Sequence, residues 1–202
     1  MEKWLQKIEL ELNGIQLIPL KKEHKEDLLK AASDGELWNL WVTSVPSKEN
    51  IDNYISTALE QQKMKKSLPF VVVDMKTNTI IGATRFCNIE VENKHLEIGY
   101  TWYAKSYQRT GVNTICKLLL LQHAFEELDA IAVEFRTNWF NYASRNAITR
   151  LGAKQDGVLR NHRINIDGSF RDTVVFSIIQ SEWPTVKKSL LFEIEKHTKK
   201  KA

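Results

Sequence analysis

Short runs in which apolar and polar residues alternate predict β-strands through much of the chain. The alternation in residues 8–20 surrounds Asn13-Gly14 and predicts two short strands, because Asn-Gly favours the backbone of a tight hairpin turn. Asp167-Gly168 predicts a longer hairpin within residues 157–179 in the same way. Further runs rich in β-branched and aromatic residues predict strands at residues 68–75, 79–91, 95–104 and 131–137. The first three of these runs are typical of an antiparallel meander.

Other segments repeat their apolar residues every three to four positions, which is the period of a helix with one buried face. Ser47 is the predicted N-cap of a helix over residues 48–63, and Gly152 ends a short helix that begins near residue 143. Pro184 suits the first turn of a C-terminal helix that starts near Ser181. The remaining helices are predicted at residues 22–34 and 115–128.

The predicted order is two strands, two helices, three strands, a helix, a strand, a helix, two strands and the terminal helix. A mostly antiparallel sheet with helices on its faces satisfies this order, so we expect the α+β class. No internal repeat, low-complexity run or linker rich in Pro and Gly divides the chain. We therefore expect a single domain over residues 1–202, with its C-terminal helix from about residue 181.

The composition of the chain argues against several classes of protein. The 202 residues are 43% hydrophobic and 27% charged, which are values typical of a globular domain. The net charge of +4 is small for a nucleic-acid binder, whose basic residues usually gather on one face. The first residues are too charged for a signal peptide, and no apolar run approaches the ~18 residues of a membrane span.

The cysteines and histidines indicate neither a disulfide framework nor a metal site. Cys87 and Cys116 form no disulfide pattern and lie in apolar surroundings, where a free cysteine is usually a small buried hydrophobe. The five histidines lack the spacing of metal ligands. We expect a reduced, cytoplasmic protein that uses no metal and does not enter a membrane.

Residues 108–113, with the sequence QRTGVN, place Gly111 where a predicted strand gives way to a helical period. A helix start offers unpaired backbone N–H groups and the positive end of the helix dipole, which together favour phosphate. Glycine would let a phosphate approach the backbone, and Arg109 would add positive charge. The alternative is that Gly111 only turns the chain and caps the helix, because short glycine motifs also occur by chance.

The wider context favours the ligand site. Three segments, LEIGYTWYAKSYQRTGVNTICKLLLLQHAFEEL, RTNWFNYASRNAITRLGAKQDGVLR and DGSFRDTVVFSI, resemble the GNAT superfamily of N-acetyltransferases and in particular its RimJ/RimL-like branch. The resemblance runs from about residue 15 to residue 179. It implies the three-layer GNAT fold, with a mixed, mostly antiparallel, seven-stranded sheet and helices on both faces. It also implies acetyl-CoA as co-substrate and direct transfer of the acetyl group to a primary amine, without a metal.

The resemblance assigns coenzyme contacts to positions of this chain. The implied pyrophosphate loop comprises Gln108, Arg109, Thr110, Gly111, Val112, Asn113 and Thr114. Backbone groups of Trp102, Tyr103 and Ala104 are the implied pantetheine contacts, and one of these N–H groups would polarise the thioester carbonyl. Position 113 departs from the family pattern, which has Gly or Ala there. The Asn113 side chain would therefore either crowd the pyrophosphate or donate to it.

A base must take a proton from the attacking ammonium, and it should have a pKa near the working pH. Glu97 is the candidate, because several superfamily members place a catalytic glutamate at the matching position. Regular alternation along the strand would put Glu97, Gly99, Thr101 and Tyr103 on one face. The alternative is that Glu97 is a solvated carboxylate and that ordered water is the base.

An acid should protonate the departing thiolate, and the family supplies it from the helix after the fifth strand. Ser144 is the matching residue, and its alternative role is that of a first-turn serine bonded to the backbone. Asn141 resembles the asparagine with which the family contacts the coenzyme. It is also a suitable N-cap for the helix, and the two roles are compatible.

The acceptor is the least defined part of this interpretation. Trp38, Trp41, Arg85 and residues 160–172 are the candidate lining of its pocket, which the family builds from the early helices and the closing hairpin. The acceptor amine stays open between a ribosomal-protein-type N-terminus and a small molecule. A non-catalytic acyl-CoA-binding regulatory module and a nucleic-acid-binding domain are the competing functions. Strand edges near residues 87–91 would suit a homodimer.

Overall fold

A single eight-stranded sheet organises the protein, whose computed structural model describes residues 2–165 and 167–199. The strands lie in the order β1-β2-β3-β4-β5-β6-β8-β7, and only β5 and β6 run parallel. Their bounds are β1 Leu10–Leu12, β2 Ile15–Pro19, β3 Ser67–Asp74, β4 Thr79–Glu90, β5 His95–Tyr103, β6 Ala132–Asn138, β7 Lys154–Ile164 and β8 Phe170–Ile179. The α+β class is confirmed. The seven strands implied by the family resemblance are one too few, whereas the alternation pattern, which predicts both strands around Asn13-Gly14, gives the observed eight.

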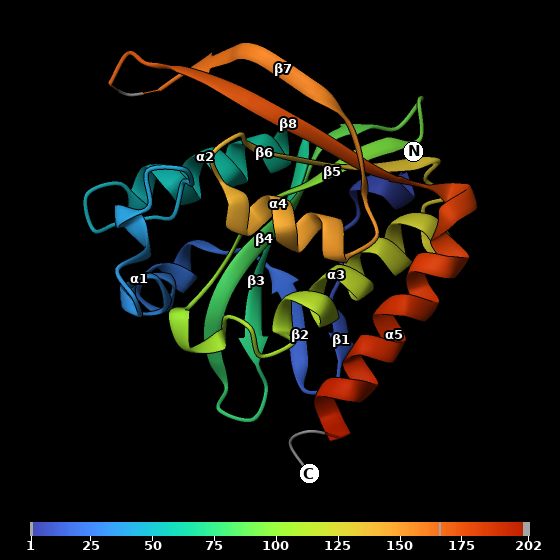
Figure 1. The fold of residues 1–202 in the computed structure, drawn as a ribbon. Coiled ribbons are helices and arrows are strands. Elements are labelled where there is room, and N and C mark those ends of the chain that lie inside the picture. The colour runs from blue at the N-terminus through green and yellow to red at the C-terminus, as the bar shows by residue number, and fades with distance from the viewer. Residues whose placement is uncertain (1, 166, 200–202) are drawn as a thin grey trace.

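Helices cover both faces of the sheet (Figure 1). The α-helices are α1 Lys25–Ser33, α2 Ile51–Lys63, α3 Val112–Gln122, α4 Tyr142–Arg150 and α5 Trp183–Lys199. Short 3-10 segments are η1 Glu2–Leu5, η2 Lys22–His24, η3 Leu37–Asn39, η4 Lys105–Tyr107 and η6 Gln180–Glu182, and η5 His123–Glu127 is a π-helical turn. None of the helices in the described ranges is long and apolar enough to cross a lipid bilayer.

Two hydrophobic cores hold these layers together. On one face the larger core includes Leu121 of α3, Ile148 of α4 and Leu190 of α5. On the opposite face, Leu28 of α1 and Ile55 of α2 belong to the smaller core. Fully burying a Leu or Ile side chain contributes about 1.5–3 kcal/mol, so these contacts fix each helix against the sheet. The three-layer arrangement follows from these two cores.

Most predicted elements are present, with shifts at their ends. The predicted start of α2 is wrong by three residues, since the helix begins at Ile51 and not directly after Ser47. The Asn50 side chain accepts a hydrogen bond from the Ser47 backbone N–H at 2.9 Å, which closes a turn before the helix. The predicted free strand edge is also wrong at Cys87, because this residue pairs with Ser67 on one side and Glu97 on the other.

The parallel ladder between β5 and β6 is unusually short, and it determines where a ligand can enter. Residues 95–97 of β5 pair with residues 132–134 of β6, and the pairing stops there. Beyond this point, β5 stays paired with β4 while β6 stays paired with β8. The sheet therefore opens between β5 and β6, on the side from which α3 and α4 start. The β7–β8 hairpin extends past this opening as an arm (Figure 1).

Candidate active site

The predicted glycine turn lies at the N-terminus of α3. Gly111 is the N-cap residue, with φ of 95°, and no side chain caps the helix. A positive φ of this size favours glycine, which explains the residue type at this position. The first-turn amides of Val112, Asn113 and Thr114 are consequently available to a ligand at the positive end of the helix.

The residues before Gly111 hold the turn in place. Gln108 donates from Nε2 to the Tyr103 carbonyl at 3.0 Å, and Thr110 donates from Oγ1 to the Tyr107 carbonyl at 2.6 Å. Arg109 is exposed and has a positive φ of 62°. Gln108 and Thr110 are thus engaged with the protein, while the exposed Arg109 guanidinium can turn toward solvent or a ligand.

The end of α5 lies over the glycine turn, a contact that no local pattern in the sequence predicts. A Cβ built on Gly111 would lie 3.5 Å from Cγ and 3.6 Å from Cβ of His197. His197 is in the last turn of α5, so the C-terminal end of this helix contacts the turn from which α3 begins. This helix end therefore forms one wall of the candidate phosphate site.

Of the three candidate pantetheine residues, only Tyr103 turns its backbone to the gap beside β5. Trp102 is buried in the core below α2, where its indole N–H donates to the Tyr54 hydroxyl at 3.2 Å, and Tyr103 is buried on the opposite face. The Ala104 N–H donates to the Ile81 carbonyl at 2.8 Å, so it faces β4. Since neighbouring residues of a strand turn their backbone groups to opposite sides, those of Tyr103 face the gap.

A β-bulge interrupts β5 between its two functional ends. Gly99 pairs with Arg85 and Trp102 pairs with Ala83, so two residues of β5 oppose Thr84 alone. Tyr100 within the bulge has φ of 52°. The predicted common face of Glu97, Gly99, Thr101 and Tyr103 is therefore wrong, because the extra residue reverses the alternation.

Thr101 follows the bulge and faces α3 instead. Its hydroxyl accepts a hydrogen bond from Nζ of Lys117 at 2.6 Å and contacts the Thr84 hydroxyl at 2.8 Å. Lys117 is only 4% exposed, and burial lowers the pKa of its amine to about 8. This buried lysine holds the bulge in place from the α3 side of the sheet.

Glu97 lies on the α2 side of the sheet, in a largely buried position. Its Oε2 accepts a hydrogen bond from Nδ2 of Asn88 at 2.7 Å and lies 3.7 Å from Nε of Arg136. Burial raises the pKa of the Glu97 carboxyl, and the Asn88 hydrogen bond and the Arg136 charge partly offset that rise. A carboxyl with a raised pKa is suited to accept a proton near neutral pH.

Arg136 connects Glu97 to a second carboxylate. Arg136 contacts Glu134 with Nη2 at 2.7 Å and with Nε at 2.8 Å, and Nε2 of His95 lies 3.2 Å from Glu134. Glu134 is therefore the main ion-pair partner of Arg136. Glu97 keeps only a long contact with that guanidinium, which leaves its carboxylate able to exchange a proton.

Asn141 and Ser144 sit together at the start of α4. Asn141 is the N-cap of this helix, and its Oδ1 accepts a hydrogen bond from the Ser144 backbone N–H at 3.0 Å. The expected capping role of Asn141 is confirmed. The hydroxyl of half-buried Ser144 makes no hydrogen bond with another described residue, so it is not occupied by the backbone.

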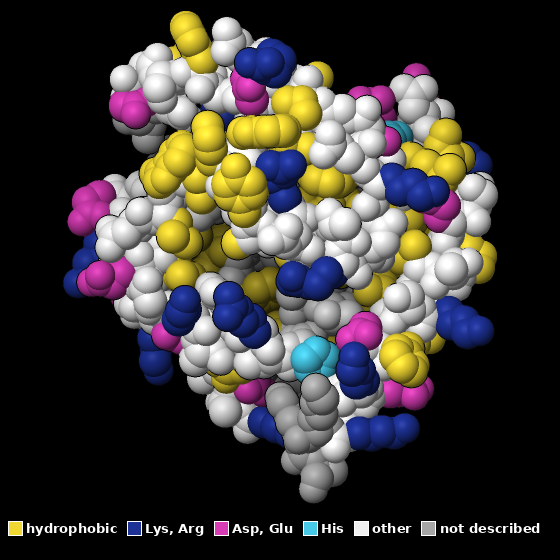
Figure 2. All heavy atoms as spheres, viewed as in Figure 1, with side chains coloured by type: hydrophobic (Ala, Val, Ile, Leu, Met, Phe, Trp, Pro, Cys, Tyr) yellow, Lys and Arg dark blue, Asp and Glu magenta, His cyan; other side chains and the backbone are white. Residues whose placement is uncertain are grey.

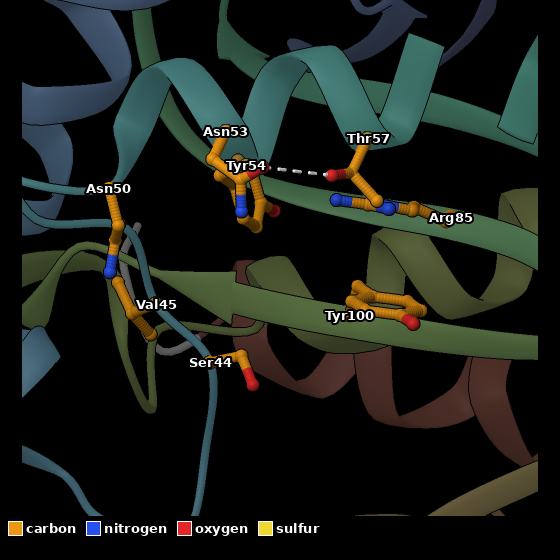
Figure 3. A pocket seen from close by; sticks show the side chains of 8 residues that line it. All are labelled: Ser44, Val45, Asn50, Asn53, Tyr54, Thr57, Arg85 and Tyr100. Atoms are coloured by element: carbon orange, nitrogen blue, oxygen red, sulfur yellow. Dashed lines mark hydrogen bonds between the residues drawn. The ribbon is translucent and has the colours of Figure 1, made fainter. Parts of the chain in front are cut away.

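A pocket of about 240 Å³ opens on the α2 side, next to Glu97 along the sheet. It is lined by Ser44, Val45, Asn50, Asn53, Tyr54, Thr57, Arg85 and Tyr100, as Figure 3 shows. Of the four candidates for the acceptor lining, only Arg85 lines this pocket. Tyr54 was not predicted because it shares the apolar face of α2, and Tyr100 was not predicted because the bulge was not foreseen.

The other acceptor candidates lie elsewhere. Trp38 packs against the smaller core. Trp41 is 68% exposed and lies 5.9 Å from Phe140, measured between ring centroids. This contact joins the segment after α1 to the loop before α4. Residues 160–172 form the end of the hairpin arm, and residue 166 among them lies outside the described residues.

Hydrophobic and basic side chains occupy different parts of the surface near these elements. Figure 2 shows hydrophobic side chains gathered along one side of a hollow on this face, with basic side chains on the other. A ligand with an apolar part and an anionic part would find a matching surface for each.

A known domain family matches most of the chain. Residues 15–154 match the Acetyltransferase (GNAT) domain family. A putative acetyltransferase from T. thermophilus is 32% identical and superposes with a TM-score of 0.79, covering 92% of this chain and 96% of that one. A structure of Mycobacterium smegmatis RimJ in complex with CoA-disulfide has a TM-score of 0.75 at 19% identity, covering 95% and 96% of the two chains.

A curated relative gives a more partial match. The putative ribosomal N-acetyltransferase YdaF of Bacillus subtilis (strain 168) is 30% identical over 105 residues. These residues are 52% of this chain and 56% of the relative, so the match spans little more than half of either protein. Among the described residues, no three His, Cys, Asp or Glu side chains are grouped as metal ligands. The predicted resemblance is confirmed, and the chain belongs to the GNAT acetyltransferase domain family.

Proposed function

We propose that this protein is an N-acetyltransferase that moves an acetyl group from acetyl-CoA directly to a primary amine. The observation that carries the proposal is the alignment of three features along β5. Uncapped amides follow Gly111 at one end, an opening separates β5 from β6 in the middle, and Glu97 lies at the other end. A phosphate site, a channel and a base are what this reaction requires.

The amides of Val112, Asn113 and Thr114 would bind the pyrophosphate, with Arg109 adding charge. Of the predicted pantetheine contacts Trp102, Tyr103 and Ala104, Tyr103 turns its backbone to the gap, and its N–H would hold the pantetheine arm. The Ala104 N–H and carbonyl are bonded to Ile81 and Tyr107, so the prediction for Ala104 does not fit the structure. The Asn113 side chain makes no hydrogen bond with another described residue, so its amide is free to donate to a phosphate oxygen. The departure from Gly or Ala at this position is therefore compatible with coenzyme binding.

The reaction balances without any further reagent. The ammonium of the acceptor loses a proton to Glu97, directly or through one water, and its nitrogen attacks the thioester carbonyl carbon. A C–N bond forms, the C–S bond breaks, and the nitrogen loses its second proton. The departing sulfur gains a proton from the Ser144 hydroxyl, which is replenished from solvent. The products are the N-acetyl amide, the free thiol of coenzyme A and one released proton.

The name of YdaF, a putative ribosomal N-acetyltransferase, supports a protein amine as the acceptor. A RimJ structure holds a coenzyme A derivative, which supports the coenzyme assignment through the shared fold. The YdaF match covers only 56% of that protein, so the acceptor class rests on the site of this chain.

Calorimetric titration with acetyl-CoA, followed by an assay of free thiol release across a panel of primary amines, tests the proposal. We expect saturable binding at one site and thiol release that depends on the amine. Binding without thiol release for any amine would replace the enzyme with a regulatory acyl-CoA-binding module. Absence of acetyl-CoA binding would exclude both the enzyme and the acyl-CoA-binding module.

A further inference from the structure

Arg85 is a buried cation in the wall of the pocket described above. Its side chain comes from β4, is 3% exposed and reaches toward α2 (Figure 3). The guanidinium carbon lies 4.1 Å from the ring centroid of Tyr100 and 4.9 Å from that of Tyr54. The two aromatic faces stabilise the charge and hold the guanidinium in one orientation.

The N–H groups of this guanidinium have no partner among the described residues. A guanidinium carries five donors in its plane, and stacking on aromatic faces leaves all of them free. Arg85 makes no ion pair or side-chain hydrogen bond with any residue in the ranges 2–165 and 167–199. By contrast, Arg136 pairs with Glu134, and Arg160 pairs with Asp172. Buried charges are ordinarily paired, so the plane of Arg85 is suited to a partner from outside the chain.

A second arginine, on the β7–β8 hairpin arm, also has a donor without a partner. Arg171 of β8 is half-buried, and its buried Nε has no hydrogen-bond partner among the described residues. It is close enough to Tyr100 and Glu97 to interact with both electrostatically, and the positive charge of Arg163 is also near. The carboxylates nearby are Glu97 and Glu134, and Arg136 and Asn88 already occupy them. Arg85 in the pocket wall and Arg171 on the hairpin arm therefore both carry positive charge without a carboxylate partner.

From these observations we infer that the acceptor amine carries a carboxylate, which Arg85 binds between Tyr54 and Tyr100. The inference rests on the proposed function and specifies its acceptor. A planar carboxylate matches the fork of donors that Arg85 presents. Asn50 and Asn53 line the same pocket and offer further amide donors.

The register of the sheet places the amine of such a substrate at the base. Arg85 pairs with Gly99, and Cys87 pairs with Glu97, so the two functional side chains stand two residues apart on one face. This separation is about 7 Å along the strands. A carboxylate and an amine joined by a few bonds would span it. Polyamines and other purely cationic amines would instead meet the like charge of Arg85.

Two sources supply this chemistry, a free amino acid and a peptide N-terminus with an acidic residue at its second position. Product analogues separate them without needing turnover. N-acetylserine is compared with N-acetylserinamide, and N-acetyl-Ser-Asp amide is compared with N-acetyl-Ser-Asn amide. Binding is measured by calorimetry in the presence of coenzyme A. We expect the acid of at least one pair to bind about tenfold or more tightly than its amide.

Arg85→Met should abolish that preference, while Arg150→Met, which removes an exposed arginine at the C-terminal end of α4, should keep it. Arg85→Lys should keep part of the preference, since it retains charge without the fork. Circular dichroism and acetyl-CoA binding check that the variants are folded. Equal affinity for acid and amide in both pairs of the unmodified protein would overturn the inference, as would a preference that survives in folded Arg85→Met. Neither result depends on thiol release, so failure of the proposed function is recognised separately.

Discussion

The carboxyl group of Glu97 lies over Gly99, its second neighbour along β5. A Cβ built on Gly99 would come within 3.1 Å of Oε1 of Glu97 and 3.1 Å of Sγ of Cys87. Both distances are shorter than an ordinary contact, so the missing side chain makes room for the carboxylate. Gly99 is thus a positioning residue for the proposed base.

Gly99→Ala should displace the Glu97 carboxyl without disturbing the coenzyme site. We expect kcat to fall about tenfold, because a misplaced base loses much of its contribution to proton transfer. The acetyl-CoA affinity should be unchanged. Gly157→Ala in β7 is the matched control, since a Cβ there meets no atom within 4 Å. Equal kcat values for the two variants would remove Gly99 from the positioning of Glu97.

The acid limb of the pH–rate profile should report the Glu97 carboxyl. Activity requires its deprotonated form, so kcat should fall as the pH drops through its raised pKa. Asn88→Gly removes the amide that stabilises the carboxylate, and glycine tolerates the φ of 48° at this position. The pKa of Glu97 should then rise further and move the limb to higher pH by about one unit. Glu97→Gln should remove the limb, and an unmoved limb in both variants would assign the base to water.

Gly111→Asp should abolish acetyl-CoA binding. The variant adds a negative charge and a side chain, directed toward His197, at the start of the helix whose first amides belong to Val112 to Thr114, and it strains a backbone with φ of 95°. We expect an affinity loss of at least about a hundredfold, or roughly 3 kcal/mol. Gly14→Asp carries the same backbone cost at φ of 77° in a distant turn, so it should bind normally. Calorimetric titration of both variants distinguishes a phosphate site from a simple turn.

Ser144→Ala should slow the step in which the thiol leaves and keep acetyl-CoA binding intact. The Ser144 backbone N–H, which bonds to Asn141, is unaffected by the change, so the helix cap is retained. We expect kcat to fall about tenfold if the hydroxyl is the acid. The measurement is thiol release under saturating amine. An unchanged rate would leave Ser144 as part of the helix start alone.

Lys117 should make stability depend on alkaline pH. Between pH 8 and 10.5 the unfolded chain keeps the lysine proton that the native protein has released, so stability rises with pH over this window. Lys117→Met removes this term. The difference in free energy of unfolding, unmodified protein minus variant, should therefore increase across the window by up to roughly 3 kcal/mol.

Two features sharpen the lysine test. The raised pKa values of Cys87 and Cys116 act in the opposite direction above about pH 9. Burial is their main cause and is present in both proteins, so the difference removes that part and leaves only the coupling of the two thiols to Lys117. Lys63→Met removes an exposed lysine from α2 and should leave the pH dependence unchanged. Urea unfolding at pH 8 and pH 10.5 provides the free energies, and parallel curves for Lys117→Met would contradict the burial argument.

Local signals in the sequence predicted most of the fold. Asp167-Gly168 and Asn13-Gly14 mark their hairpins because the turn geometry depends on these residues alone. The start of α3 at Gly111 and the terminal helix with Pro184 in its first turn are confirmed for the same reason. A turn or cap is decided by a few neighbouring residues, so a single sequence reveals it.

Features that depend on distant partners were not predictable. The bulge at Tyr100 arises where β5 must pair with β4 while leaving β6, and nothing in the alternation of LEIGYTWY marks the extra residue. Because the bulge was missed, Thr101 and Tyr103 were predicted on the wrong face of the sheet. Likewise, the stacking of Arg85 between Tyr54 and Tyr100 joins three segments that meet only in the folded protein.

The short ladder between β5 and β6 divides the sheet into two plates, one of five strands and one of three, joined along a seam of three residue pairs. A molecule lodged in the opening would supply main-chain contacts that the seam lacks, so it would bind the folded protein and not the unfolded chain. Saturation with such a molecule at a hundred times its dissociation constant adds about 2.7 kcal/mol to stability. The coenzyme would then be a removable part of the architecture as well as a reactant, and the protein emptied of it should be the first form lost on heating.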